Sequence, residues 1–163
     1  MNKKITVIGA TGLIGLPVTK ALVKSGFEVT VLVRDVEKAA AVMPAGVSLV
    51  KGDLRSRVDI GRAIKNADGV YINLNTTFND TEKGFLSERE GVDNIVAELK
   101  GSTVKQVGFL TSFLSRDYPG DWWVMKVKED AVKKIKASGV PFTIFRSSSF
   151  MENFRGPYAG KGR

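Results

Sequence analysis

The chain has 163 residues, of which 43% are hydrophobic and 26% are charged, as is typical of one soluble globular domain with a sizeable core. It contains no Cys and no His, which excludes disulfides, thiolate chemistry and a Ser-His-Asp triad and removes the usual zinc ligands, so we expect no metal site. The formal net charge of +8 raises the question of nucleic acid. However, acidic residues interrupt the lysine-rich stretch 126–136 and no aromatic stacking strip accompanies it, so we expect a solvated helix face.

An apolar strand ending at Ile8 runs directly into three glycines at three-residue spacing, Gly9, Gly12 and Gly15, and an amphipathic helix follows. The first two glycines allow a tight turn and let backbone amides approach a pyrophosphate, whereas Gly15 lets the helix pack closely on its strand. A helix N-terminus has unpaired amides and a partial positive charge, so it attracts the anion. The segment therefore predicts a dinucleotide site rather than an ordinary tight turn.

The rest of the chain alternates strand and helix. The expected strands are residues 27–33, 47–50, 69–74, 104–110 and 141–145, and the expected helices are 35–42, 56–65, 82–99 and 122–137. This alternation predicts an α/β fold, a doubly wound parallel sheet of about six strands in the order 3-2-1-4-5-6 with helices on both faces. We expect residues 1–146 to form this Rossmann-like domain and residues 147–163 to be an irregular tail.

No run of about 18 apolar residues predicts a membrane span. No charged and apolar leader precedes the first strand, so we expect no secretion signal and a cytoplasmic location.

The end of the second predicted strand bears on the choice of dinucleotide. Arg34 lies 19 positions after Gly15, where an NAD site places a carboxylate against the adenosine ribose. A guanidinium instead suits a 2′-phosphate, and Lys51 at the end of the third strand adds a second positive charge. We therefore favour NADP(H) over NAD(H). The alternatives are a solvated Arg34, or Asp35 as the ribose acceptor, which would restore NAD.

Several other residues follow predicted strands at the same edge of the sheet. Asp53 comes just after the third strand, where adenine should rest, and helix capping is its alternative role. Thr111, Ser112 and Ser115 follow the fifth strand and are placed to orient a substrate carbonyl or, alternatively, to stabilise a turn. The candidate cofactor-binding residues are Gly9, Thr11, Gly12, Leu13, Ile14, Gly15, Arg34, Lys51, Asp53, Leu54, Asn75, Thr111 and Lys126.

The last predicted helix supplies the one catalytic candidate, Lys126. Helical spacing places Trp122, Lys126, Glu129 and Lys133 on one face. A nearly opposite apolar stripe should pack on the sheet, and it consists of Val124, Val127, Ala131 and Ile135. Lys126 is placed to bond the nicotinamide ribose and to influence a nearby proton donor, and a surface lysine is the alternative. The exposed tryptophans of this helix fit either a pocket or a dimer face, so an oligomer stays open.

Several segments match one family in the expected order. They are the loop 9–15 and residues 31–35, 51–54, 68–71, 138–146 and 150–154. Over nearly its whole length the chain resembles the NmrA-like, atypical branch of the short-chain dehydrogenase/reductase superfamily. The resemblance implies an NADP-binding domain, often with reductase activity on quinone-like or other carbonyl compounds. Some relatives instead sense the redox state of the cofactor and regulate partners.

Two departures from the family pattern matter. The Tyr-x-x-x-Lys pair of the superfamily reads Trp122-Trp123-Val124-Met125-Lys126, so the lysine is kept without the tyrosine proton donor, and an indole N–H cannot act as an acid near neutral pH. Members of this branch also continue past the sixth strand into a substrate-binding portion, so we expect a C-terminally short form.

Three functions follow from these patterns. The leading one is an NADPH-dependent oxidoreductase acting on a quinone or other carbonyl compound, with catalysis supplied by proximity and by the cofactor. The alternative is a non-catalytic NADP(H)-sensing regulatory or interaction module. A sugar-nucleotide epimerase or dehydratase remnant ranks third, because those enzymes also rely on the absent tyrosine.

Overall fold

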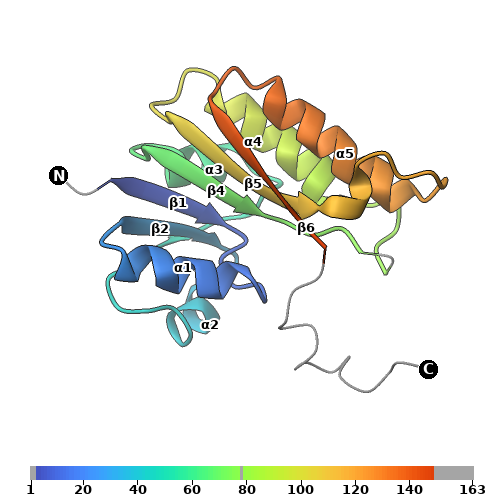
Figure 1. Cartoon of the computed structure of the whole chain (residues 1–163). Helices are drawn as coiled ribbons and strands as arrows, with labels where there is room; N and C mark the ends of the chain where they lie inside the picture. Colours follow the sequence, from blue (N-terminus) through green and yellow to red (C-terminus); the bar gives the residue numbers. More distant parts are fainter. Residues whose placement is uncertain (1–2, 78, 149–163) are drawn as a thin grey trace.

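The computed structural model describes residues 3–77 and 79–148 and contains one parallel sheet (Figure 1). Its strands are β1 (Lys4–Ile8), β2 (Glu28–Val33), β3 (Ser48–Lys51), β4 (Gly69–Asn73), β5 (Gln106–Ser112) and β6 (Phe142–Ser147). The strand order is β3-β2-β1-β4-β5-β6, which confirms the predicted topology. Residues 149–163, which include most of the predicted tail and one family motif, lie outside the described residues.

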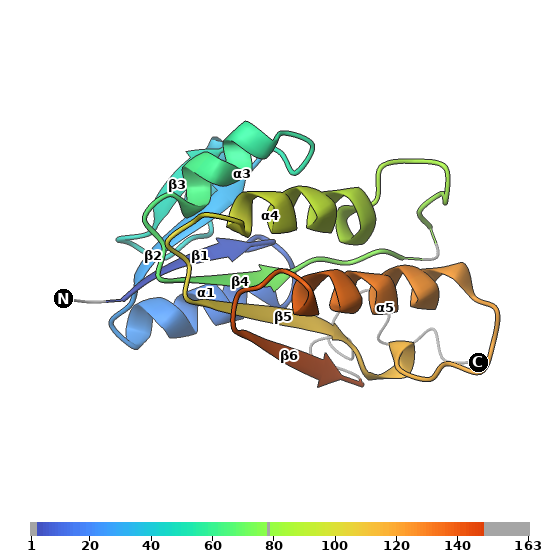
Figure 2. The ribbon, with the colours of Figure 1, turned by 90° about the horizontal axis from the view of Figure 1, so that it is seen from above.

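Helices cover both faces of this sheet. They are α1 (Gly15–Lys24), α2 (Val36–Ala40), α3 (Arg57–Ile64), α4 (Val92–Leu99) and α5 (Trp123–Lys136). The first two lie on one face and the other three lie on the opposite face (Figures 1 and 2). The larger core, around the fully buried Phe109 and Ile95, fills the space between the sheet and α3, α4 and α5. A smaller core around Val31 joins the sheet to α1 and α2.

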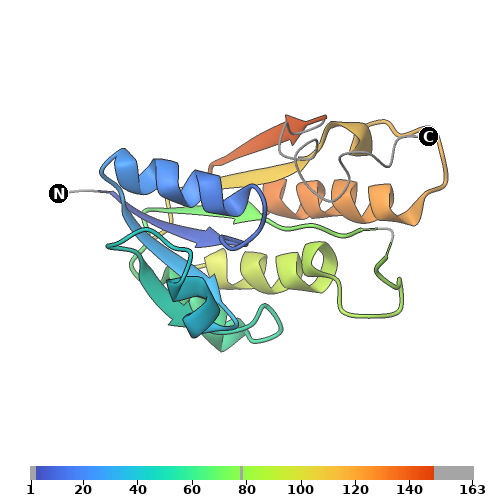
Figure 3. The same cartoon turned by 90° about the horizontal axis from the view of Figure 1, so that it is seen from below.

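The strand order creates a crevice at the carboxyl edge of the sheet. From β1 the chain proceeds outward through β2 to β3, and it then returns to β4 on the other side of β1. The loops after β1 and β4 therefore leave in opposite directions, and such a switch point is where open α/β sheets bind ligands. Figure 3 shows α1 along β1, with the loop between them at this edge. In the described part of the chain, no helix is both long enough and apolar enough to cross a bilayer.

Two elements differ from the sequence prediction. The helix predicted over residues 82–99 begins only at Ser87, and its first turn, η1 (Ser87–Gly91), is π-helical. Leu86 before it is extended, and its amide donates a hydrogen bond of 2.9 Å to the Glu90 carboxylate, which stops the helix from extending backwards. The fifth strand runs past its predicted end to Ser112, because it continues to pair with β6 as far as Ser147.

Candidate functional site

The loop between β1 and α1 requires glycine at two positions. Gly9 has φ +85°, and a Cβ there would lie 1.9 Å from the carbonyl oxygen of Asn73. A Cβ on Gly15 would lie 2.0 Å from the carbonyl oxygen of Gly9, so α1 packs directly on the loop. At Gly12 the corresponding contact to Gly9 is 3.4 Å, and the protein itself leaves room for a side chain. Packing within the protein therefore does not require glycine at position 12.

The N-terminus of α1 has features that favour an anion. No side chain caps the helix at Ile14, and its first turn contains no acidic residue. The first amides of a helix have no partner within the helix, and they carry the positive end of its dipole. An anion at this point satisfies both properties.

A cleft of about 520 Å³, which we call the central cleft, opens at this N-terminus. It lies between the β1–α1 loop, the ends of β4 and β5 and the start of α5. Its lining includes Gly12, Leu13, Ile14, Asn75, Thr111 and Lys128. The structure thus brings five of the predicted cofactor-binding residues into one cleft.

A second hollow of about 770 Å³, which we call the β3 cleft, lies at the ends of β2 and β3 beside α3. Arg34, Lys51 and Asp53 line it, as the sequence predicts for neighbouring strand ends. Arg34 also lines an adjoining hollow of about 350 Å³, where it is joined by Gly9, Thr11 and Leu54. Apart from Gly15 and Lys126, the predicted site residues therefore fall into two groups, one at the central cleft and one at the β3 cleft with its adjoining hollow.

The structure shows which of two acidic candidates has a helix-capping role. Asp35 caps α2, because its carboxylate accepts a hydrogen bond of 3.0 Å from the amide of Lys38, and this bond lowers the pKa of Asp35. Asp53 does not cap α3, since that role belongs to Ser56. Instead, Asp53 accepts a 2.8 Å hydrogen bond from the Arg55 amide, which holds its carboxylate at the wall of the β3 cleft.

The structure does not bring Lys126 to the central cleft. Its side chain is exposed on the outer face of α5, where its ammonium pairs with Asp121, and this carboxylate raises the pKa of Lys126. The position does not support the cofactor contact predicted for Lys126. The reason is helical register, because the side of α5 that faces the sheet contains Val124, Met125, Lys128, Ala131, Val132 and Ile135.

Lys128 is the cation that the sequence analysis missed. Its side chain is 9% exposed, and its Nζ lies 2.7 Å from Oε2 of Glu88 and 3.1 Å from Oδ1 of Asn75. A signal for it was present in the sequence. A lysine four residues after Val124 and three before Ala131 lies within the apolar stripe, which indicates a buried and paired cation. A second missed cation, Arg62, lines the β3 cleft and donates a 2.7 Å hydrogen bond to the carbonyl of Lys51.

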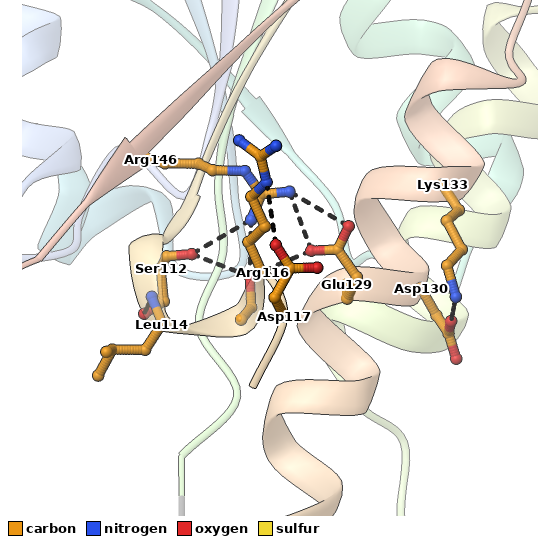
Figure 4. Close-up of polar contacts among 9 residues, drawn as sticks. Ser112, Leu114, Arg116, Asp117, Glu129, Asp130, Lys133 and Arg146 are labelled. Carbon is orange, nitrogen blue, oxygen red and sulfur yellow. Dashed lines mark hydrogen bonds and ion pairs between the residues drawn. The ribbon is translucent and has the colours of Figure 1, made fainter. Parts of the chain in front are cut away.

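Two of the three predicted hydroxyls fix the segment between β5 and α5. Figure 4 shows Arg146 of β6 reaching the Glu129 carboxylate beside this segment, and the guanidinium lies 2.9 Å from Oε2 of Glu129. The same guanidinium donates to the Ser115 hydroxyl at 3.0 Å, and the Ser112 hydroxyl accepts from the amide of Leu114 at 3.1 Å. Thr111 differs from both serines. Its buried hydroxyl has no hydrogen-bond partner among the described residues, and Thr111 lines the central cleft.

A parallel sheet of this order, with a glycine loop at its switch point and clefts on both sides, defines a Rossmann-type protein of the NAD(P)-binding class. The chain belongs to the NAD(P)H-binding family, whose model matches residues 9–161. This family match and the fold shared with solved neighbours confirm the NAD(P)-binding Rossmann fold that the resemblance implies.

Individual relatives cover a range of roles. The chain is 24% identical to the photosystem II assembly factor Ycf39 of Synechocystis sp. over 156 residues. This alignment covers 96% of this chain and 48% of that protein. The structure of the NADPH-dependent quinone oxidoreductase QOR2 of Escherichia coli, complexed with NADPH, matches with a TM-score of 0.77 at 19% identity, over 93% of this chain and 51% of that one. Triphenylmethane reductase of Citrobacter sp., complexed with NADP(H), matches with a TM-score of 0.77 at 20% identity, over the same shares. The chain thus spans about half the length of the relatives it matches.

Proposed function

We propose that this chain binds NADP(H) and belongs to a reductase that transfers hydride to a quinone or another conjugated carbonyl compound. The observation that carries the proposal is that the β1–α1 loop lines the central cleft on one side and, on the other, the hollow that shares Arg34 and Asp53 with the β3 cleft. An extended dinucleotide fits this arrangement, with its pyrophosphate at the N-terminus of α1. Arg34, Lys51 and Asp53 would then hold the adenosine end, and Asn75, Thr111 and Lys128 the nicotinamide end.

The charges of the β3 cleft support NADP(H) over NAD(H). Its lining contains the cations Arg34, Lys51 and Arg62 and the carboxylates Asp53 and Asp59, and Arg62 is paired with Asp59 at 2.7 Å. Arg34 is therefore the guanidinium available to grip a phosphate with two parallel hydrogen bonds. The carboxylate nearest in sequence to the ribose position, Asp35, is occupied as a helix cap. Solved neighbours include complexes with NADPH and NADP(H) and one with NAD+, so the choice of NADP(H) rests on the residues of the β3 cleft.

The walls of the central cleft support a planar acceptor. Trp122 and Leu13 are 38% and 59% exposed and line the cleft, and Tyr118 lies edge-on against Trp122 at 6.3 Å between ring centroids. Aromatic walls favour flat conjugated ligands. NADPH, when bound, supplies the hydride. Lys128 is the one titratable residue that lines this cleft among the described residues, and its ammonium would stabilise the negative charge that develops on the acceptor oxygen.

The experiment is a turnover assay that follows the absorbance of NADPH with a panel of quinones and aromatic aldehydes. We expect acceptor-dependent oxidation in the unmodified protein, a loss of at least about tenfold in kcat for Lys128→Met, and no change for Lys126→Met. Equal losses in the two variants would contradict the assignment of Lys128.

A non-catalytic NADP(H)-sensing module is the second candidate. The described lining of the central cleft contains no tyrosine and no carboxylic acid, so the usual proton donor of the superfamily is missing there. A sensor should bind NADPH and NADP with different affinities and show no turnover with any acceptor.

A further inference from the structure

The most deeply buried charges in the described part of the chain form one network behind the central cleft. Glu88 is fully buried, and its Oε2 accepts hydrogen bonds from Nζ of Lys128 at 2.7 Å and from the amide of Thr76 at 2.6 Å. Nζ of Lys128 also donates to Oδ1 of Asn75 at 3.1 Å. Asn75, Thr76 and Lys128 all line the cleft, whereas Glu88 lies behind them.

An unusual piece of backbone turns Glu88 toward this network. Glu88 belongs to the π-helical turn η1, and π-turns are rare and frequently occur at functional sites. The amide of Leu86 is tied to the Glu90 side chain at 2.9 Å, and Gly91 at the end of the turn packs against Leu54. The turn is therefore anchored on both sides of Glu88.

Stability alone does not account for such a pair. Two buried charges lose their hydration, and replacing a buried ion pair with packed apolar side chains is often neutral or stabilising. The pair also has a carboxylate oxygen to spare, since Oε1 of Glu88 has no hydrogen-bond partner among the described residues. A purely structural site would gain more from an apolar core at this position.

The hydrogen bonds of Lys128 indicate what the pair does. An ammonium group has three donors. Glu88 and Asn75 accept two of them, and the third has no acceptor among the residues that the structure describes. Because Lys128 lines the central cleft, that donor is available to an oxygen atom bound there.

Glu88 is the counter-ion that Lys128 faces. The other charged side chains of the elements packed against α5 are already paired: Arg89 with Glu90 on η1, Asp93 of α4 with Lys134, Glu98 of α4 with Arg57, and Arg146 of β6 with Glu129.

We propose that Glu88 is a positioning residue, which holds the Lys128 ammonium at the wall of the central cleft with one N–H directed to the acceptor oxygen. This inference rests on the proposed reductase function. Glu88 does not line the cleft, so it acts on a bound acceptor through Lys128, while the Thr76 amide holds the Glu88 carboxylate in place.

A double-mutant cycle on turnover separates positioning from a merely structural role. Glu88→Gln keeps the size of the side chain and removes its charge, and we expect kcat to fall about tenfold or more while the KM for NADPH changes less than about twofold. In a Lys128→Met background the same substitution should change kcat by less than about twofold, because the group that it positions is already absent. An equal fall in both backgrounds would overturn the proposal. Glu88→Asp keeps the charge and should retain more activity than Glu88→Gln.

A second readout needs neither cofactor nor acceptor. In protein labelled at the lysine ε-carbon, the Lys128 signal is identified by its loss in Lys128→Met. A held side chain gives two separate Hε shifts, which should merge toward the average of exposed lysines in Glu88→Gln. An unchanged Lys128 signal in Glu88→Gln would overturn the inference. If Glu88→Gln does not fold, Glu88→Met, which also removes the charge, takes its place, and the same two results decide.

The two readouts also separate this inference from the proposed function. The unmodified protein could show no turnover while its Lys128 Hε shifts are separate and merge in Glu88→Gln. That result would refute the reductase function and support the positioning of Lys128 by Glu88.

Discussion

Alanine at Gly15 and alanine at Gly12 should cause different defects, although both glycines lie in the same loop. A Cβ on Gly15 would lie 2.0 Å from the carbonyl oxygen of Gly9, 2.9 Å from its carbonyl carbon and 3.0 Å from Cα of Ala10. All three are backbone atoms, so no flexible side chain can move to relieve the clash. Overpacking of this kind costs about 3 kcal/mol, and the better helix propensity of alanine offsets about 1 kcal/mol. We therefore expect Gly15→Ala to lose about 2 kcal/mol of unfolding free energy.

Gly12→Ala should leave the fold intact and weaken binding. Its Cβ would meet the Gly9 carbonyl oxygen at 3.4 Å, an ordinary contact, so the unfolding free energy should change by less than about 0.5 kcal/mol. Gly12 lines the central cleft at the N-terminus of α1, where a methyl group would obstruct a pyrophosphate. We expect the Kd for NADPH to rise at least about tenfold, or about 1.4 kcal/mol.

Urea unfolding of the unliganded proteins and calorimetric titration with NADPH measure the two quantities separately. Gly101→Ala is the matched control, because Gly101 has φ +80° with no atom within 4 Å of its Cβ and lies far from the clefts. It should lose some stability through backbone strain and keep its affinity for NADPH. Unweakened NADPH binding by Gly12→Ala, or undiminished stability of Gly15→Ala, would refute the reasoning.

Three further predictions concern named side chains. Arg34→Ala should weaken NADPH binding by about 1–3 kcal/mol, the range for a charge-assisted hydrogen bond, while NADH binding hardly changes; equal losses in calorimetry would contradict a 2′-phosphate role. Lys128→Met should lower the unfolding free energy by about 3–5 kcal/mol, because the Glu88 carboxylate is left buried and uncompensated. The unfolding free energy of Lys126→Met should lie within about 0.5 kcal/mol of that of the unmodified protein in urea unfolding. A larger loss in Lys126→Met than in Lys128→Met would show that the register of α5 is misassigned. Ser56→Ala removes the cap of α3 and should cost about 0.5–2 kcal/mol in thermal unfolding without altering NADPH affinity.

The sheet could be predicted because its signals are local and repeated. Each of the first five strands is a short apolar run followed by a helix, and right-handed crossovers leave few topologies for such a chain. The spacing of the glycines also predicts the shape of the loop, because Gly9 and Gly15 contact each other through backbone atoms of a single short loop. Arg34 and Lys51 lie at the carboxyl ends of paired strands, and their common cleft follows from that.

The residues that were missed depend on contacts between distant segments. Lys126 and Lys128 differ by two positions, yet this difference in helical register places one in solvent and the other against Glu88. The sequence around Glu88 predicts an ordinary α-helix, and the spacing of its apolar residues does not indicate a π-turn there. Arg62 reaches the β3 cleft through the carbonyl of Lys51, which is a tertiary contact without any sequence signature.

The central claim is that the loop between β1 and α1 holds the pyrophosphate of NADP(H). We would test it first by calorimetric titration of the purified protein with NADPH and with NADH, while following the fluorescence of Trp122 at the central cleft. The account predicts saturable, micromolar binding of NADPH, a change in tryptophan emission, and binding of NADH weaker by at least about tenfold. The absence of saturable heat with NADPH would contradict it.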